Sequence, residues 1–216
     1  MRDTFHKELE SLDQDVVRMG ALVEQSTLIV TTALIESDKE LAEKVKRGDQ
    51  EIDDLFMDME KRALTVLAQQ APVAGDLRLI VAILRVINDL ERAGDLTFNI
   101  ARMVEEGDFG QPRLKPVKSI VSELGNAAAH LMGRAIDAWA AKDEAQCAEI
   151  ATEDDEIDEL HSVLLEKLVE MKGDNALALG VRLALVGRYF ERIGDHAVNM
   201  GERARYFLTG NEEHLS

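Results

Sequence analysis

An internal duplication constrains the fold of this chain more than any other feature of its sequence. The segment DLERAGDLTFNI (residues 89–100) shares Glu-Arg-x-Gly-Asp with YFERIGDHAVNM (residues 189–200), and in both an Asn follows four residues after the Asp. Upstream, SDKELAEKVKRGDQEIDDL (residues 37–55) aligns with KDEAQCAEIATEDDEIDEL (residues 142–160) at an offset of 105 residues. The chain must therefore be built from two similar units.

The offset between the two copies falls from 105 to 100 residues before the Glu-Arg-x-Gly-Asp segments, so the second copy lacks five residues in between. QQAPVAGD (residues 69–76) has the Pro and Gly of a break between helices, whereas KGDN (residues 172–175) is shorter. Insertions in a connection leave packed helices intact. We therefore expect the shortening to lie in the connection.

The composition favours helices throughout the chain. Aromatic residues make up only 4% of it and there are three prolines, whereas strands would be richer in aromatic and β-branched residues. Apolar residues recur at spacings of three and four, as on one face of a helix. The expected helices are 4–36, 39–70 and 76–106 in the first copy and 117–141, 143–172 and 175–209 in the second, with 106–116 as linker. Expected N-caps are Asp38, Asp76, Asp143 and either Asp174 or Asn175, and Gly75 and Gly173 are expected where helices stop.

Six helices in two copies predict an all-α fold of two tandem three-helix bundles, joined end to end or side by side. We expect the first bundle to comprise residues 1–108 and the second residues 109–216.

Charge and hydropathy exclude several classes of function. With 42 acidic and 25 basic residues the formal net charge is −17, which opposes binding to nucleic acid. The apolar stretch LIVTTALI (residues 28–35) is far shorter than a membrane span, and MRDTFHKELE lacks the apolar segment of a signal peptide. The lone Cys147 cannot form an internal disulfide and is best explained by packing. We expect a cytoplasmic protein.

Carboxylates recur at matching positions beside the apolar stripes of both copies. In the expected third helices, Glu91 and Asp95 correspond to Glu191 and Asp195, one turn apart. The expected second helices carry further pairs, which are Asp49 with Asp53 and Asp154 with Asp158. If the four carboxylates of a copy converge, a hard cation that prefers oxygen ligands would neutralise them. Most acidic pairs at this spacing are solvated or paired, so a surface network with Arg92 and Arg192 is the alternative.

Other chemistries find little support in the sequence. There is no G-x-S-x-G, no Gly-Lys dipeptide for a P-loop, and no Glu-x-x-His of the kind that di-iron oxidases use. His161 and His196 are replaced by Phe56 and Leu96 in the first copy, which favours packing over metal binding. No catalytic residue is predicted.

With these residues in view, the chain resembles the PhoU family of phosphate-uptake regulators. The resemblance rests on MRDTFHKEL at the start, QAPVAGDLRLI at the first inter-helix turn, and above all the two Glu-x-x-x-Asp motifs in DLERAGD and FERIGDHAVNM. It implies two tandem three-helix bundles and places the family's metal-binding motif on Glu91 with Asp95 and on Glu191 with Asp195. Asp49, Asp53, Asp154 and Asp158 are candidate ligands on geometric grounds alone.

The resemblance also implies a function. We expect a non-enzymatic cytoplasmic regulator that links the ATPase subunit of the phosphate ABC transporter to a sensor histidine kinase and keeps the phosphate-starvation response off. It is expected to be a homodimer, to approach the membrane only through its partners, and to bind metal ions such as iron, zinc, manganese or magnesium. The alternative is a carboxylate helical bundle that binds metal as an enzyme or as a metal store.

Overall fold

The protein is all-α, as the sequence predicts. A computed structural model describes residues 2–107, 109–211 and 213, with the side chains of residues 2–4 and 113 outside the description, and contains no strand within those ranges. The elements are α1 (Arg2–Glu36), α2 (Lys39–Gln70), α3 (Ala74–Glu106), a 3₁₀ turn η1 (Pro112–Leu114), α4 (Lys115–Ala141), α5 (Glu144–Glu153), α6 (Asp155–Val169) and α7 (Ala176–Thr209). The expected boundary between the copies falls at residue 108, which lies outside the described residues.

Five of the six expected helices are present with ends close to the predicted ones, but the expected helix 143–172 is two helices. α5 and α6 meet at Asp154, where the Ile157 amide donates to the Asp154 carbonyl in a tightened i to i+3 turn. Asp38 and Asp143 are confirmed as N-caps, since each carboxylate accepts hydrogen bonds from two backbone amides of the helix that follows.

The predictions for the starts of the two third helices were partly wrong. α3 begins at Ala74, so Gly75 does not end a helix and Asp76 lies in the first turn instead of at the cap. Asn175 does precede α7, but in the left-handed conformation and without a side-chain capping bond. Gly173 lies in the connection between α6 and α7, as expected, with a φ of 109° that favours glycine.

The shortening of the second copy also lies elsewhere than predicted. The connection between α2 and α3 spans only residues 71–73, whereas that between α6 and α7 spans residues 170–175. The missing residues therefore come from the helical arm, and α6 ends early at Val169. Val169 at the end of α6 and Leu177 in the first turn of α7 are exposed.

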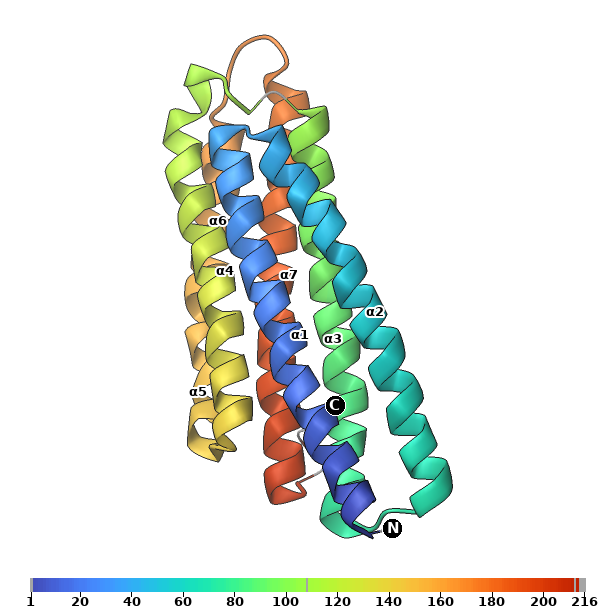
Figure 1. Cartoon of the computed structure of the whole chain (residues 1–216). Coiled ribbons are helices and arrows are strands. Elements are labelled where there is room, and N and C mark those ends of the chain that lie inside the picture. The colour runs from blue at the N-terminus through green and yellow to red at the C-terminus, as the bar shows by residue number, and fades with distance from the viewer. Residues whose placement is uncertain (1, 108, 212, 214–216) are drawn as a thin grey trace.

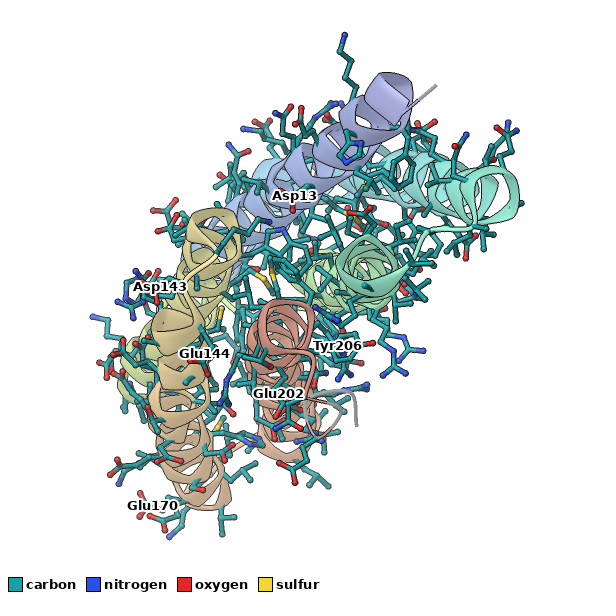
Figure 2. All side chains as sticks on the ribbon, turned by 90° about the horizontal axis from the view of Figure 1, so that it is seen from below. Asp13, Asp143, Glu144, Glu170, Glu202 and Tyr206 are labelled. Carbon is teal, nitrogen blue, oxygen red and sulfur yellow. The ribbon has the colours of Figure 1, made fainter. Side chains whose placement is uncertain are left out.

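The two bundles lie side by side with their long axes roughly parallel (Figure 1). Viewed along the helices, α2 lies at one end of an elongated cross-section and the α5–α6 arm at the other, with α3 and α7 between them (Figure 2). Contacts between the bundles are made by α1 with α4 and by α3 with α7. The buried side chains of both bundles form one continuous apolar core. The two bundles therefore share one core and pack against each other through two pairs of helices.

Two glycines related by the duplication allow α1 and α4 to approach closely. A Cβ added to Gly20 would lie 2.6 Å from Ile136 Cγ1, and one added to Gly125 would lie 2.3 Å from Thr31 Oγ1. Residues 20 and 125, like residues 31 and 136, are 105 apart. The contact is therefore made twice, once from each side, as expected for two similar units related by a pseudo-two-fold axis.

A polar cluster closes the lower end of this interface. Asp13 of α1, labelled in Figure 2, accepts hydrogen bonds from the Trp139 indole at 2.9 Å and from the Lys142 ammonium, and Lys142 also lies over the Trp139 ring. Trp139 is fully buried, so its indole N–H needs this partner.

Throughout the described part of the chain, no helix has the length and apolar character required to cross a membrane.

Candidate functional site

The third helices of the two bundles present their motif carboxylates in the same way. Glu91 and Glu191 are half-buried, whereas Asp95 and Asp195 are exposed, and the burial pattern of residues 91–100 repeats position by position in residues 191–200. The apolar neighbours of these carboxylates face the core, which fixes the rotation of each helix. The duplication in sequence is therefore also a duplication in three dimensions.

In the first bundle, the acids of α2 face the motif on α3, as predicted. Burial first, and then the neighbouring charges of Asp53 and Asp95, raise the pKa of Asp49 to about 6. Burial also raises the pKa values of Glu91 and Asp95, and in both cases the charge of Asp53 adds to the effect. The four carboxylates therefore lie on one side of the bundle and repel one another.

The second bundle brings together the equivalent four groups. Burial, followed by the charges of Asp158 and Asp195, raises the pKa of Asp154 to about 6. Burial and the charge of Asp195 raise the pKa of Glu191, while an ion pair with the Arg188 guanidinium opposes that rise. In each bundle, the second-helix acids and the motif acids are thus close enough for charges on one helix to raise pKa values on the other.

The glycine within each motif lets the carboxylates approach the third helix. A Cβ on Gly94 would lie 3.4 Å from Asp49 Oδ1, and a Cβ on Gly194 would lie only 2.7 Å from Asp154 Oδ1. At Gly194 even a methyl group would overlap the carboxylate of Asp154, whereas at Gly94 it would only touch that of Asp49. The site in the second bundle is the more closely packed of the two.

These residues fit a cation by their chemistry. Asp154 Oδ1 and Glu191 Oε2 are buried and have no hydrogen-bond partner, which is unfavourable for carboxylate oxygens unless a cation binds them. The atoms that would coordinate a metal ion here are all carboxylate oxygens, the ligand type that hard divalent cations prefer. Nevertheless, in the ranges that the structure covers, no three His, Cys, Asp or Glu side chains are already grouped closely enough to hold a metal ion. Binding would therefore draw the side chains of the second and third helices together.

Of the alternative network with Arg92 and Arg192, the structure keeps the charge of Arg92, which opposes the rise in the pKa of Glu91. Among the described residues, neither arginine forms an ion pair with a motif carboxylate. Arg188 does pair with Glu191, whereas the equivalent residue in the first bundle is Asn88, whose amide donates to the Leu84 carbonyl. One of the eight carboxylates is therefore partly neutralised by an arginine.

A buried polar contact between the bundles was missed by the sequence analysis. Asp89 accepts a hydrogen bond from the Asn199 amide and lies 3.0 Å from His196 Nδ1, at the interface of α3 and α7. Asp89 and His196 are buried, so His196 does pack as predicted but beside a carboxylate. The available signal was a break in the repeat, because Tyr189 replaces Asp89 in the second copy and Leu96 replaces His196 in the first.

Known proteins match the chain along nearly its whole length. The PhoU domain family model matches residues 16–104 and again residues 121–204, one match in each bundle. PhoU homolog 1 of Mycobacterium bovis, named a phosphate-specific transport system accessory protein, is 33% identical over 97% of this chain and 95% of its own. The Pseudomonas putida homologue of that accessory protein is 32% identical over 96% and 82%.

Solved structures agree with the sequence matches. The crystal structure of PhoU from Pseudomonas aeruginosa aligns with a TM-score of 0.87 and 32% identity, covering 96% of this chain and all of the other. The phosphate transport system regulatory protein PhoU of Streptococcus pneumoniae aligns with a TM-score of 0.86 at 26% identity, over 96% and 98%.

Proposed function

Because the chain belongs to the PhoU domain family, we propose that it is an accessory protein of phosphate transport that represses the phosphate-starvation response when phosphate is plentiful. It acts as an adaptor between the ATPase subunit of the phosphate ABC transporter and a sensor histidine kinase. It works in the cytoplasm, reaches the membrane only through these partners, and forms a homodimer. The observation that carries the proposal is the match of both bundles, one after the other, to the family.

Metal binding is the second part of the proposal. Glu191, Asp195, Asp154 and Asp158 hold a divalent cation in the second bundle, and the equivalent residues Glu91, Asp95, Asp49 and Asp53 hold one in the first. A bound cation supplies positive charge that neutralises mutually repelling carboxylates. The chain's own contribution is to hold those carboxylates on two helices that the cation then bridges. Support comes from the unpartnered buried oxygens and from the raised pKa values.

An adaptor is favoured over an enzyme or a metal store. The long helices offer broad surfaces to other proteins, and a net charge of −17 favours partners with basic patches. The motif of the di-iron oxidases is absent from the sequence, so the carboxylates lack the histidine ligands of that chemistry.

Two experiments test the proposal. A strain that lacks the protein should express a phosphate-starvation reporter in phosphate-rich medium, and repression that is unchanged would contradict the regulatory role. The purified protein should bind the transporter ATPase or the cytoplasmic part of the kinase without turnover. Metal-dependent oxygen consumption, or many metal ions per chain, would instead favour the enzyme or the metal store.

A further inference from the structure

Exposed apolar residues form two neighbouring stripes at the end of the second bundle where α6 meets α7. On α7 they are Leu177, Val181 and Leu185, and on α6 they are Leu165 and Val169. The spacing of four residues keeps each set on one face of its helix. Leu177 and Val169 are 83% and 88% exposed, far beyond what side chains that contribute to the core show. Scattered exposed apolar residues are ordinary, but five of them at the same end of two contacting helices mark an interaction site.

The apolar stripes lead directly into the carboxylate site of the second bundle. On α7, the face that carries Leu177 and Val181 continues through Arg188 to Glu191 and Asp195. On α6, the equivalent face continues from Leu165 back through His161 to Asp158 and Asp154. His161 lies against α7, because a Cβ on Gly187 would be 3.1 Å from its Cδ2 atom. The two faces therefore stay together as one surface, apolar at one end and acidic at the other, called here the α6–α7 surface.

We propose that the α6–α7 surface binds an amphipathic helix of another protein, with apolar residues over the stripes and Lys or Arg over the carboxylates. From Leu177 to Asp195 the surface extends about 27 Å, the length of a helix of about 18 residues. Charge favours a basic end, because Asp158 and Asp195 present exposed carboxylates at this end of the surface. Asp155, Glu156 and Glu159 are further exposed acids next to Asp158, so the local charge stays negative even when one divalent cation, Arg188 and Arg192 are counted.

A second copy of this chain does not fit the surface as well. Each copy carries a net charge of −17, and a symmetric contact through the same surface would place the carboxylates of one copy against either the carboxylates or the apolar stripes of the other, neither of which neutralises them. A basic amphipathic helix is complementary to both ends of the surface. Helices of this kind bind apolar surfaces through residues spaced three and four apart.

The corresponding surface of the first bundle is interrupted by charge. Arg85 stands where the second bundle has Leu185, and Glu60 stands where it has Leu165. Val81, the counterpart of Val181, is half-buried, and the exposed Leu77 and Leu64, the counterparts of Leu177 and Val169, are separated from the carboxylates by these charged residues. The first bundle therefore provides a matched internal control within the same chain.

The inference rests on the proposed adaptor role and adds the surface and the chemistry of one partner. A photo-crosslinking amino acid is placed in the full chain at Val181 and, separately, at Arg192, which is exposed beside the carboxylates. After illumination in cells, mass spectrometry identifies the joined residues. Both positions should capture one helical segment of another protein, at points about 11 residues apart, because residues 181 and 192 are about 17 Å apart along α7. Val181 should join its apolar part and Arg192 its basic end.

Two controls make the result specific. Crosslinkers at Val81 and Arg92 in the first bundle should give at least ten-fold less of this adduct, and Leu177→Glu should reduce the Val181 adduct by a similar factor. Because Leu177 is 83% exposed, the variant should keep the melting temperature of the parent protein. Adducts only with a second copy, adducts with an acidic segment, equal yields from Val81, or no adduct would each overturn the inference.

The proposed function is tested separately by binding of the purified protein to the transporter ATPase and to the kinase. If the unaltered protein binds either partner and the Leu177→Glu variant binds it equally well, the adaptor role stands and the α6–α7 surface is not the site for that partner. If the unaltered protein binds neither, the adaptor role itself fails.

Discussion

The two carboxylate sites have the same residues in the same order but differ in their surroundings. In the first bundle, Asp49 lies within the continuous helix α2, and the motif glycine leaves room beside it. In the second, Asp154 lies at the interruption between α5 and α6, pressed against Gly194, and its Oδ1 has no partner. The second site therefore contains buried carboxylate oxygens without a hydrogen-bond partner, which a bound cation would stabilise.

The local sequence explains why only the second copy is interrupted. The run EDDEIDE (residues 153–159) replaces GDQEIDD (residues 48–54), so two more acids are placed around Asp154. Like charges three and four residues apart destabilise a helix. Duplication thus preserved the positions of the candidate ligands, while the number of charged residues next to them came to differ. A repeated motif therefore does not guarantee two sites with equal properties.

The largest expected effect concerns the packing of the bundles against each other. Gly125→Ala should lower the free energy of unfolding by about 2 kcal/mol, because the new Cβ would meet the short Thr31 side chain and the buried Phe190 ring. Gly20→Ala should cost about 1 kcal/mol, because its new Cβ would meet Ile136 alone and at a slightly longer distance of 2.6 Å. In both cases the helical preference for alanine offsets about 1 kcal/mol of the cost. Urea denaturation measures both variants, and equal losses would show that the two contacts are equivalent.

The next effect is on metal binding. Replacing Glu191 with Gln and Asp195 with Asn keeps the side-chain volumes but removes two charges, so cation affinity should fall at least about ten-fold, or about 1.4 kcal/mol. Glu91→Gln with Asp95→Asn should have a smaller effect, because the unpartnered buried oxygens lie in the second site. Elemental analysis of purified protein gives the metal content, and a phosphate-starvation reporter shows whether repression is lost.

The two readouts separate three outcomes for these double variants. Metal loss together with derepression in phosphate-rich medium supports a cation that acts in signalling. Metal loss with normal repression would assign the cation a structural role only. Unchanged metal content in both variants would end the metal proposal, since a surface network contributes only about 0 to 1 kcal/mol and its loss would leave metal content untouched.

Sequence reasoning recovers the fold because the signals are local and repeated. Apolar periodicity identifies the helices, and Asp38 and Asp143 mark two helix starts through capping chemistry that depends only on neighbouring residues. The expectation that second-helix acids face the motif acids rests on a related local signal, whereas their role as metal ligands stays a prediction. Residues one turn apart on one helix share a face, and the duplication shows which faces recur.

The features that sequence reasoning missed depend on contacts between distant segments. The pairing of Asp89 with His196 joins residues 107 apart and occurs only once, so the repeat gives no second example of it. The early end of α6 at Val169 has no Pro to mark it, and the second copy keeps enough apolar periodicity to suggest a longer helix. The break at Asp154 reflects accumulated repulsion, which periodicity does not measure.

A smaller effect should appear in the pH dependence of stability. The folded-state pKa values of Asp49 and Asp154 are raised to about 6, above the ordinary value of 3.8 expected in the unfolded chain. Each group therefore contributes stability that is fully present below about pH 4 and is lost as the pH rises through 6. Because both groups are partly exposed, we expect a loss of about 1 kcal/mol per site.

Thermal unfolding of chelator-treated protein tests this expectation. The pH should be varied from about 4.5 to about 7.5, a range that brackets the pKa of about 6. Asp49→Asn and Asp154→Asn should each flatten the profile by a similar amount, because the two pKa values are alike. Adding a divalent cation at the higher pH should restore stability to the unaltered protein. A profile that neither substitution changes would show that the pKa values of these two carboxyl groups are not raised by burial and neighbouring charge.

The smallest effect compares the motif glycines. Gly94→Ala should be neutral or slightly stabilising, because the new Cβ would meet its neighbours at 3.3–3.4 Å and alanine is favoured in helices by about 1 kcal/mol. Gly194→Ala should lose that gain, because its Cβ would lie 2.7 Å from Asp154 Oδ1 and 2.8 Å from Ile157 Cδ1. The difference between the variants in unfolding free energy should be about 1 kcal/mol. Because the displaced atom is a candidate ligand, Gly194→Ala should also weaken cation binding, whereas Gly94→Ala should leave it nearly unchanged. Equal stability and equal metal affinity in the two variants would mean that the closer packing around Asp154 has no energetic consequence, and the contrast between the bundles would then reduce to the helix break alone.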